Sequence, residues 1–442
     1  MNARVSAALW SVTSLLVLAL VIRNTAAIAV LAPLDPNEGW NAAHTLLLLS
    51  TGTPYPPPHA LMVNNYPPLS FYPVAALTLW TGDAVIAGRI LSLLSFLAIA
   101  AALALVCRQM GCRLRARICA ALFFAAVLLV CSDYVAMDDP QLMGHAVQLL
   151  ALLLVLRRHV AAAAVMFAAS LFLKHNLVAL PLATAAWLLW QDRPAALRYV
   201  LCGAATLGAG LLLFRFSYGF SLFSVISSSR QISLANSLLA AAHLWWAVLP
   251  LAALTLSRGP WKDFCAAYAA IALALGLFFS AGDGVDANAF FDLAAACALT
   301  LGLAIEQGRR PLMTALCAAP LPLFLAWNFH DNNFFFTRDF AAQSARDIAF
   351  LKSRSGPVLC DQLSLCLWAG KGAQVDVFGI GEQIKAGARD GAPLAQMIAE
   401  RRFAVVQLED RNALGPLVRG ALERRYRLHH SDDNGNFLTP LP

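Results

Sequence analysis

Long apolar runs alternate with short polar segments over the first 330 residues. The runs occupy residues 7–31, 89–107, 118–132, 142–156, 160–173, 177–190, 199–214, 238–256, 264–280, 289–305 and 312–329. A helix needs about 20 apolar residues to cross a bilayer. Strands of an outer-membrane barrel alternate apolar and polar side chains instead. The pattern predicts a polytopic all-α membrane protein with about 11 transmembrane helices.

The pattern changes after residue 330. Short apolar runs at 357–360, 374–378 and 403–408 are separated by polar segments that contain glycine. The first and last of these runs are typical of buried strands, and residues 341–353 and 393–401 are typical of helices. We therefore expect a membrane domain over residues 1–330, with a long first outer loop at 32–88, and a small α/β domain over residues 331–442.

Composition agrees with a membrane protein. Hydrophobic residues make up 60% of the 442 residues and charged residues 13%, whereas soluble domains average about 45–50% and about 25%. These values exclude a disordered chain, a collagen, a coiled coil and an ordinary cytosolic enzyme. Arginines are spread over short loops rather than clustered on one face, so nucleic acid is not an expected partner.

Charged residues are sorted by side. With a cytoplasmic N-terminus, the inside segments hold 13 basic residues: Arg4, Arg108, Arg113, Arg115, Arg117, Arg157, Arg158, Arg193, Arg198, Arg258, Lys262, Arg309 and Arg310. The outer loops hold the acids Asp35, Glu38, Asp83, Asp133, Asp138, Asp139, Asp283 and Asp286. Because cytoplasmic loops are enriched in Lys and Arg, we expect the N-terminus inside and the C-terminal domain outside.

Two segments are compatible with more than one topology. The first run follows Arg4 like a signal peptide, but it is long and holds Arg23 and Asn24, so we interpret it as a retained helix. Residues 66–82 are apolar enough for a short span, yet a span there would move every later loop to the opposite side. We expect this segment to lie in the outer interface.

Of the ten cysteines, eight lie in or beside apolar runs, where Cys usually fills space. Cys360 and Cys366 lie in the outer domain, where a disulfide is permitted. No C-x-x-C spacing or His/Cys cluster indicates zinc.

The first outer loop carries Asp35 and Glu38. Asp35 suits a helix N-cap, Pro36 the first helical position, Glu38 a capping box and Gly52 a C-cap. Two carboxylates at a membrane–water boundary also suit a general base and its orienting partner. The second outer loop places Asp138 and Asp139 at a helix start. There they either complement the helix dipole or serve a site at membrane depth.

Cations interrupt the apolar pattern at Lys174-His175 and at Arg230. Lys174 is either a snorkelling residue at a helix end or, with His175, part of an anion site near the outer interface. Arg230 is a second candidate cation. Asp292 lies four residues into an apolar run, where an acid usually has a function.

Together these residues resemble the GT-C superfamily of integral-membrane glycosyltransferases, most of all its bacterial branch of protein mannosyltransferases and aminoarabinose transferases. The resemblance covers the chain through about residue 330. It rests on Asp35–Gly39, Gly52-x-Pro54-Tyr55, Asn65-Tyr66-Pro67-Pro68, Asp138-Asp139, Lys174, and Gly282-x-Gly284 with Asn288.

The resemblance implies an inverting transfer of sugar from a polyprenyl-phosphate-linked donor to a hydroxyl of an unknown lipid, glycan or protein acceptor. The reaction would occur at the outer face of a bacterial inner membrane. Glu38 matches the family's catalytic base in position, and Asp35 shares or takes the role; Asp138 and Asp139 are further catalytic candidates. Lys174, His175, Arg230, Asn65 and Tyr66 are expected to bind substrate or phosphate. Some members need a divalent metal and others do not, so a metal remains open.

Two other functions fit the apolar pattern. A transporter or flippase of a lipid-linked or anionic substrate also carries polar residues in the membrane, but typically shows broken helices in paired halves, which this sequence lacks. A non-catalytic scaffold would not need acids clustered on one side.

Overall fold

The computed structural model of the chain describes residues 3–131, 134–227, 230–308, 311–331 and 338–442. Asp133, Arg309 and Arg310, which were part of the expected charge sorting, lie outside the described residues.

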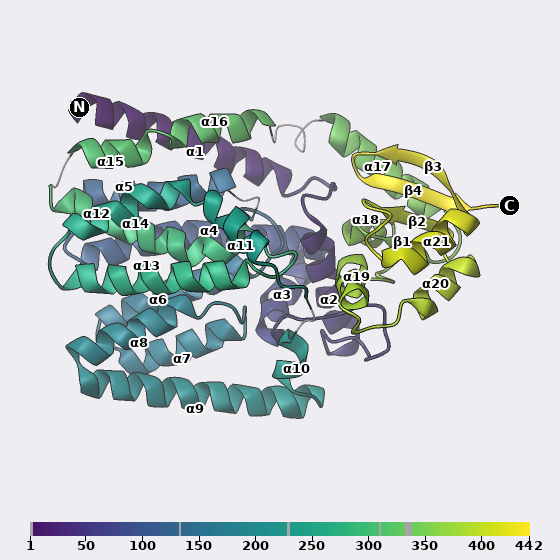
Figure 1. Cartoon of the computed structure of the whole chain (residues 1–442), viewed down its shortest axis with the longest axis horizontal. Coiled ribbons are helices and arrows are strands. Elements are labelled where there is room, and N and C mark those ends of the chain that lie inside the picture. The colour runs from purple at the N-terminus through teal and green to yellow at the C-terminus, as the bar shows by residue number, and fades with distance from the viewer. Residues whose placement is uncertain (1–2, 132–133, 228–229, 309–310, 332–337) are drawn as a thin grey trace.

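A long helical bundle makes up most of the molecule (Figure 1). Its elements are α1 (Ala3–Ala27), α2 (Pro36–Thr51), η1 (Pro68–Ser70), α3 (Phe71–Thr81), α4 (Ala84–Gln109), α5 (Leu114–Cys131), α6 (Gln141–Leu156), α7 (Val160–Leu171), α8 (Ala179–Gln191), α9 (Arg193–Tyr218), α10 (Leu222–Ile226), α11 (Leu234–Ala242), α12 (Trp245–Leu256), α13 (Pro260–Phe279), η2 (Ala287–Phe290), α14 (Phe291–Glu306), α15 (Pro311–Ala318) and α16 (Leu321–Asp331).

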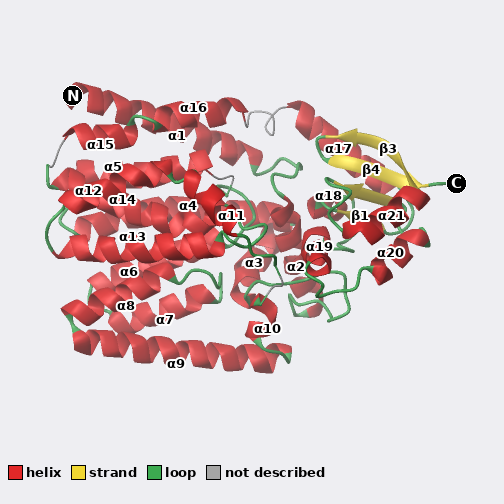
Figure 2. Ribbon diagram, in the orientation of Figure 1, coloured by secondary structure: helices red, strands yellow, loops and turns green. Residues whose placement is uncertain are grey.

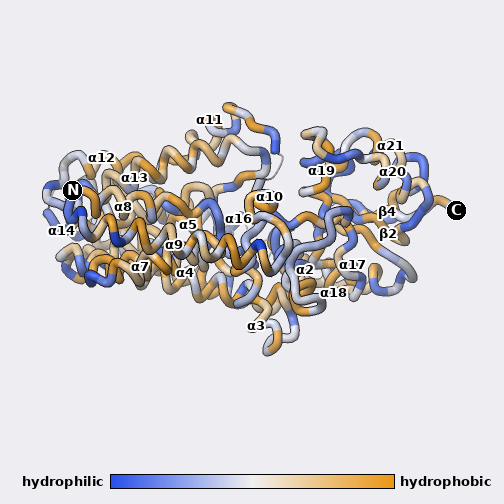
Figure 3. Tube along the Cα trace, turned by 90° about the horizontal axis from the view of Figure 1, so that it is seen from below, coloured by the Kyte–Doolittle hydropathy of each residue, from blue (hydrophilic) through white to orange (hydrophobic). Residues whose placement is uncertain are grey.

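Each of the expected apolar runs contains a helix, and hydrophobic residues follow these helices along the bundle (Figure 3). Within the described residues, five helices are long and apolar enough to cross a membrane on their own: α1, α4, α9, α13 and the helix that ends with α14. Helices α11 and α12 add a sixth span if they count as one, with a bend of 74° between them. Helices α6, α7 and the α15–α16 segment are apolar but shorter.

The bundle is built around α14. In its apolar window 89% of residues are buried, against 11% for α9 at the edge of the bundle. Gly302 of α14 allows close contact, because a side chain there would meet Cys107 of α4 and Ala120 of α5. Helix α9 therefore leaves most of its apolar surface for lipid, while α14 is a core helix.

The two ends of the bundle differ in charge. At the end that holds the N-terminus (Figure 1), Arg113 pairs with Glu306 at 2.8 Å and the Arg258 N–H donates to Gln307. The acids of the first and second outer loops lie at the opposite end, which the C-terminal domain covers. The turns that hold Arg113 and Arg258 and the loops that hold these acids therefore lie at opposite ends of the bundle.

Helix α3 starts and finishes at the same end of the bundle. Tyr66, just before it, donates a hydrogen bond to Asp139, and Asp83, just after it, accepts one from Trp368 of the C-terminal domain. Residues 66–82 therefore do not cross the bundle, as the sequence predicted. Tyr72 of this helix is 45% exposed and Trp80 is 89% exposed.

The C-terminal domain contains the four-stranded sheet (Figure 2). Its elements are α17 (Arg338–Ser353), β1 (Val358–Cys360), α18 (Leu363–Trp368), α19 (Val377–Lys385), α20 (Ala392–Ala399), β2 (Val405–Leu408), α21 (Gly415–Arg425), β3 (Tyr426–Asp432) and β4 (Gly435–Pro440).

The strand order is β1-β2-β4-β3, with β1 parallel to β2 and the other pairs antiparallel. Both expected strands and both expected helices of this domain are confirmed, whereas the β3–β4 hairpin was not predicted. Strand β3 lies at the edge of the sheet, and most of its side chains are polar and exposed. Its sequence therefore lacks the apolar run that predicts a buried strand. A disulfide joins Cys360, at the end of β1, to Cys366 in α18.

Candidate active site

The first outer loop begins with a capped helix. Asp35 accepts a hydrogen bond from the Asn37 N–H at 2.7 Å, Pro36 opens α2, and Gly52 ends it in the left-handed conformation. The expected capping is confirmed with one correction: Glu38 accepts from the Leu34 N–H at 3.0 Å rather than from the N-cap residue. The helix therefore fixes Asp35 at its tip.

Glu38 forms a buried ion pair with Arg89 of α4. Arg89 Nε and Nη2 lie 2.7 and 2.6 Å from the two Glu38 oxygens, and both side chains are fully buried. Arg89 also donates to the Val30 and Ala32 carbonyls that follow α1. A bidentate pair of this kind is directional and strong. Glu38 therefore ties α1, α2 and α4 together, and it does not line the cavity described below.

Asp138 is buried beside this ion pair. Its N–H donates to Glu38 at 3.3 Å, its carbonyl accepts from Asn41, and its carboxyl occupies space that the absent side chain of Gly88 leaves. Burial, followed by the negative charge of Glu38, raises the pKa of the Asp138 carboxyl well above its usual range. This environment therefore favours the protonated form of Asp138.

Asp139 and Lys174 form a second buried pair. Lys174 Nζ lies 3.1 Å from Asp139 Oδ2 and 3.6 Å from the centre of the Tyr66 ring, and the Tyr66 hydroxyl donates to the same carboxylate. Asp139 also accepts from the Gln141 N–H at the start of α6. Lys174 is 4% exposed, so it does not snorkel into water. It supports Tyr66, which in turn lines the cavity.

His175 and Arg230 differ in their surroundings. Burial, together with the charges of Lys174 and Arg230, lowers the pKa of His175 to about 4, so the imidazole is uncharged at neutral pH. Arg230 donates to the Asp283 carbonyl at 3.1 Å, faces the Phe378 ring and lines the cavity. Among the described residues that line this cavity, Arg230 is the one with a permanent positive charge.

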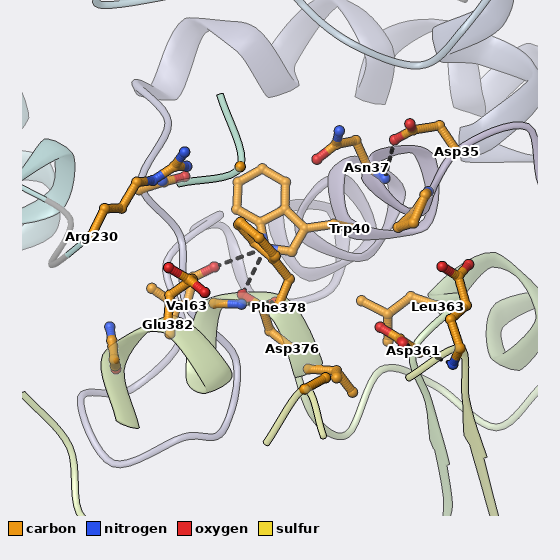
Figure 4. A pocket seen from close by; sticks show the side chains of 18 of the residues that line it. Asp35, Asn37, Trp40, Val63, Arg230, Asp361, Leu363, Asp376, Phe378 and Glu382 are labelled. Atoms are coloured by element: carbon orange, nitrogen blue, oxygen red, sulfur yellow. Dashed lines mark hydrogen bonds between the residues drawn. The ribbon is translucent and has the colours of Figure 1, made fainter. Parts of the chain in front are cut away.

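A cavity of about 590 Å³ lies between the first outer loop and the C-terminal domain. Asp35 and Arg230 are on opposite sides of Trp40 (Figure 4). Asn65 and Tyr66 also line the cavity, as their proposed binding role requires. Its described acidic lining residues are Asp35, Asp286, Asp361, Asp376, Glu382, Glu409 and Asp410.

Burial changes the acidity of this lining. It raises the pKa of Asp35 to about 7, with a further increase from the charges of Glu38 and Asp139 and a decrease from the Asn37 hydrogen bond. Burial likewise raises the pKa values of Asp361 and Asp376 to about 6. A carboxylate with a pKa close to neutral is well suited to accept a proton.

The C-terminal domain is attached to the first loop by hydrogen bonds. Trp40 Nε1 donates to Asp376 at 3.1 Å and to the Val63 carbonyl at 3.0 Å, and the Asp376 N–H donates to the Leu61 carbonyl. At Gly39, any side chain would collide with the backbone of Leu363 and Ser364, so glycine permits this contact. The C-terminal domain therefore forms one wall of the site, which the sequence did not predict.

A second cavity adjoins the first. It has a volume of about 730 Å³ and is lined largely by apolar residues of α5, α11, α12 and α14, among them Trp245, Trp246 and Phe291. The two cavities share the wall residues Gly284, Val285 and Asp286. Gly284 has a φ of 69°, and a side chain there would collide with Phe378, so this expected motif glycine is required where the cavities meet. The second cavity, here called the apolar groove, thus adjoins the first cavity, here called the acidic chamber.

Asp292 belongs to neither cavity. It accepts a hydrogen bond of 2.6 Å from Tyr268, and His145 lies 4.0 Å away. Its partner explains how an acid is accommodated inside an apolar helix, since buried polar groups are usually hydrogen-bonded.

No family model and no curated protein matches this chain in sequence. Solved structures match its fold. The crystal structure of ArnT from Cupriavidus metallidurans bound to undecaprenyl phosphate has a TM-score of 0.62 at 13% identity and covers 96% of this chain and 97% of that chain. Apo ArnT from the same organism gives 0.61 at 14% identity with the same coverage. The chain therefore has the fold of ArnT, the GT-C fold that its outer-loop motifs resemble.

Proposed function

We propose that this protein is an inverting glycosyltransferase that moves a sugar from a polyprenyl-phosphate donor to an acceptor hydroxyl at the outer face of the membrane. The observation that carries the proposal is the junction of the two cavities. An apolar groove for a lipid chain meets an acidic chamber for a sugar, with Arg230 and Asp35 in the chamber wall.

Asp35 is the proposed base. It is fixed by the α2 N-terminus, lines the chamber and has a raised pKa of about 7. Glu38, by contrast, has both oxygens engaged by Arg89. In the reaction, the bond between the anomeric carbon and the phosphate oxygen breaks, the acceptor oxygen attacks that carbon from the opposite face, and Asp35 takes the acceptor proton. Polyprenyl phosphate leaves.

Arg230 is the proposed phosphate ligand, because it is the permanent cation of the described chamber lining. A fixed guanidinium stabilises the negative charge that develops on a leaving phosphate. The prenyl chain would lie in the apolar groove beside α12. The binding of undecaprenyl phosphate by ArnT, whose fold this chain shares, supports this assignment.

The acidic residues of the chamber limit the charge that the donor sugar can carry. Glycosyl transfer passes through a state with positive charge on the sugar ring, which nearby carboxylates stabilise. The same carboxylates disfavour a sugar that carries a negative charge. We therefore propose that the donor sugar is neutral or positively charged, and that a uronic acid is a poor donor.

We also propose the orientation that the loop charges predict, with the N-terminus in the cytoplasm and the C-terminal domain outside a bacterial inner membrane. Reporter fusions at residue 112 and at residue 442 should then report opposite sides. The same side for both would overturn this orientation.

The decisive experiment is radiolabelled transfer by the purified chain. Polyprenyl-phosphate-linked neutral, amino and acidic sugars are offered with membrane-lipid and glycan acceptors, and both labelled product and released polyprenyl phosphate are counted. EDTA in a parallel arm reports any need for a divalent metal. Proteoliposomes with donor in one leaflet test the flippase alternative: movement of intact donor without release of polyprenyl phosphate would overturn the proposal. Asp35→Asn, which preserves the cap, is the matched inactive control.

A further inference from the structure

A histidine and two carboxylates converge on the C-terminal domain, apart from both cavities. His430 Nε2, on β3, lies 3.0 Å from Asp347 Oδ1 of α17 and 3.7 Å from Asp432 Oδ2 at the end of β3. One ligand atom from each of the three residues lies within 4.8 Å of the others. Asp347 lies 83 residues before His430, whereas His430 and Asp432 are two residues apart on β3, so the sequence alone shows only part of the group.

The β3–β4 hairpin orients the His430 side chain. Strand β3 has an irregular register between Leu428 and His430, and a bulge of this kind redirects a side chain. The His430 ring stacks on Phe437 of β4, with centroids 4.3 Å apart and planes inclined by 9°. Its orientation is therefore fixed by the hairpin rather than by Asp347 alone.

Asp347 is held from its other side. Asn434, in the β3–β4 turn, donates to Asp347 Oδ2 at 2.7 Å and also contacts Ser344. This leaves Oδ1 directed at His430. Support of a ligating carboxylate by an outer hydrogen-bond donor is typical of metal sites. Asp347 is buried, whereas His430 and Asp432 are partly exposed, so an ion can reach the group from solvent.

The tautomer of His430 determines whether its Nε2 can bind a cation. His430 Nδ1 lies 2.9 Å from His429 Nδ1, so one of these nitrogens donates a proton to the other. If His430 donates, a neutral His430 ring presents the lone pair of Nε2 to two carboxylate oxygens. Three electron-rich atoms then face one another, and a bound cation relieves their repulsion.

We propose that Asp347, His430 and Asp432 bind a Zn²⁺ ion. Zinc takes His nitrogen and carboxylate oxygen at roughly 2.0–2.2 Å in a tetrahedron, which places ligand atoms about 3.4 Å apart. Two of the three separations, 3.0 and 3.7 Å, bracket that value, and the third is at most 4.8 Å. Solvent would supply the fourth ligand. The ion would clamp α17, the first helix of the C-terminal domain, to the edge hairpin of the sheet, and it would take no part in sugar transfer.

The test uses the full chain, purified in detergent with a tag that lacks histidine. After treatment with EDTA, Zn²⁺ alone is titrated, and bound metal is measured by mass spectrometry alongside the melting temperature. We expect one zinc per chain and a melting temperature that rises with zinc. His430→Gln and Asp347→Asn should bind at least tenfold more weakly, whereas Asp433→Asn, an exposed acid next to the site, should behave as wild type.

Asp432→Asn is the second site variant, because its partly exposed position makes loss of folding less of a concern. It too should bind zinc at least tenfold more weakly while retaining the metal-free melting temperature. A wild-type chain that binds no zinc, or site variants that keep wild-type affinity, would overturn the proposal. A melting temperature that is unaffected by zinc but depends on His430 would assign the group to a protonated histidine instead.

Discussion

Two groups of acids lie at the same end of the helical bundle, and they differ in their partners. Glu38 and Asp139 are buried against Arg89 and Lys174. Asp35 and Asp361, at the cavity, have no basic partner within salt-bridge distance in the part of the chain that the structure describes. Asp35 and Glu38 are only three residues apart, yet they belong to different groups.

The presence or absence of a basic partner determines the charge state of a buried acid. A buried acid that faces an arginine is held as an ion, and removing one partner leaves an uncompensated charge. A buried acid without such a partner has a raised pKa, which reduces stability when the acid ionises but makes the group a proton acceptor near neutral pH. We therefore expect paired acids to govern folding and unpaired acids to govern chemistry.

The largest expected effect is on turnover. Asp35→Asn keeps a good N-cap, so the free energy of unfolding should change little. Loss of the base should reduce transfer about 10²–10⁴-fold. Transfer kinetics and thermal unfolding of the same preparation check both. Near-normal transfer by a folded Asp35→Asn chain would contradict the assignment, and Glu38 would again be the leading candidate.

Glu38→Gln should act on stability instead. It leaves Arg89 buried without its partner, and breaking such a pair costs about 3–5 kcal/mol. Unfolding in detergent measures this loss. The double variant Glu38→Gln with Arg89→Gln removes the unpaired charge and should recover part of the stability. If Glu38→Gln is as stable as wild type but inactive, the comparison between the two groups of acids fails.

Arg230→Gln tests the cation of the chamber. A charge-assisted contact is worth about 1.5–3 kcal/mol, so the KM for the polyprenyl-phosphate sugar should rise about tenfold to a hundredfold. The exposed Arg425→Gln serves as the matched control. An unchanged KM with the donor would remove Arg230 from the phosphate site.

The pH profile gives the smallest and most specific effect. Because the pKa of Asp35 is raised to about 7, the carboxyl is mostly protonated at pH 6 and cannot act as a base. Transfer should fall about tenfold for each pH unit below 7 and level off above it. Asp35→Asn should lack this limb in its residual activity. A wild-type rate that stays constant between pH 5 and 8 would contradict the assigned base.

Much of the fold follows from local sequence. The apolar runs predict the helices, and the Asp35–Pro36 start and the Gly52 end of α2 are readable from capping preferences alone. The position of residues 66–82 followed from loop charges, which constrain a whole topology rather than one element. The β3–β4 hairpin was not predicted because its exposed edge strand, β3, lacks a run of apolar residues.

The site was harder to predict because its contacts are long-range. Arg89 lies 51 residues from Glu38, and the sequence offered one sign of the pair: an arginine a few residues into an apolar helix, where a charge needs a partner. Asp361 and Asp376 reach the chamber only because the C-terminal domain packs against α2. No periodicity or spacing specifies such docking.

The hydrogen bonds from Trp40 to Val63 and Asp376 also determine the order in which the walls of the chamber form during synthesis. Trp40 leaves the ribosome more than 300 residues before Asp376, so the membrane helices can be in place while one wall of the chamber is still missing. An unfinished molecule then has the groove without a closed compartment beside it. In the proposed mechanism, the active site is therefore completed only when the C-terminal domain has folded. A nascent chain without that domain would not transfer the donor sugar to water.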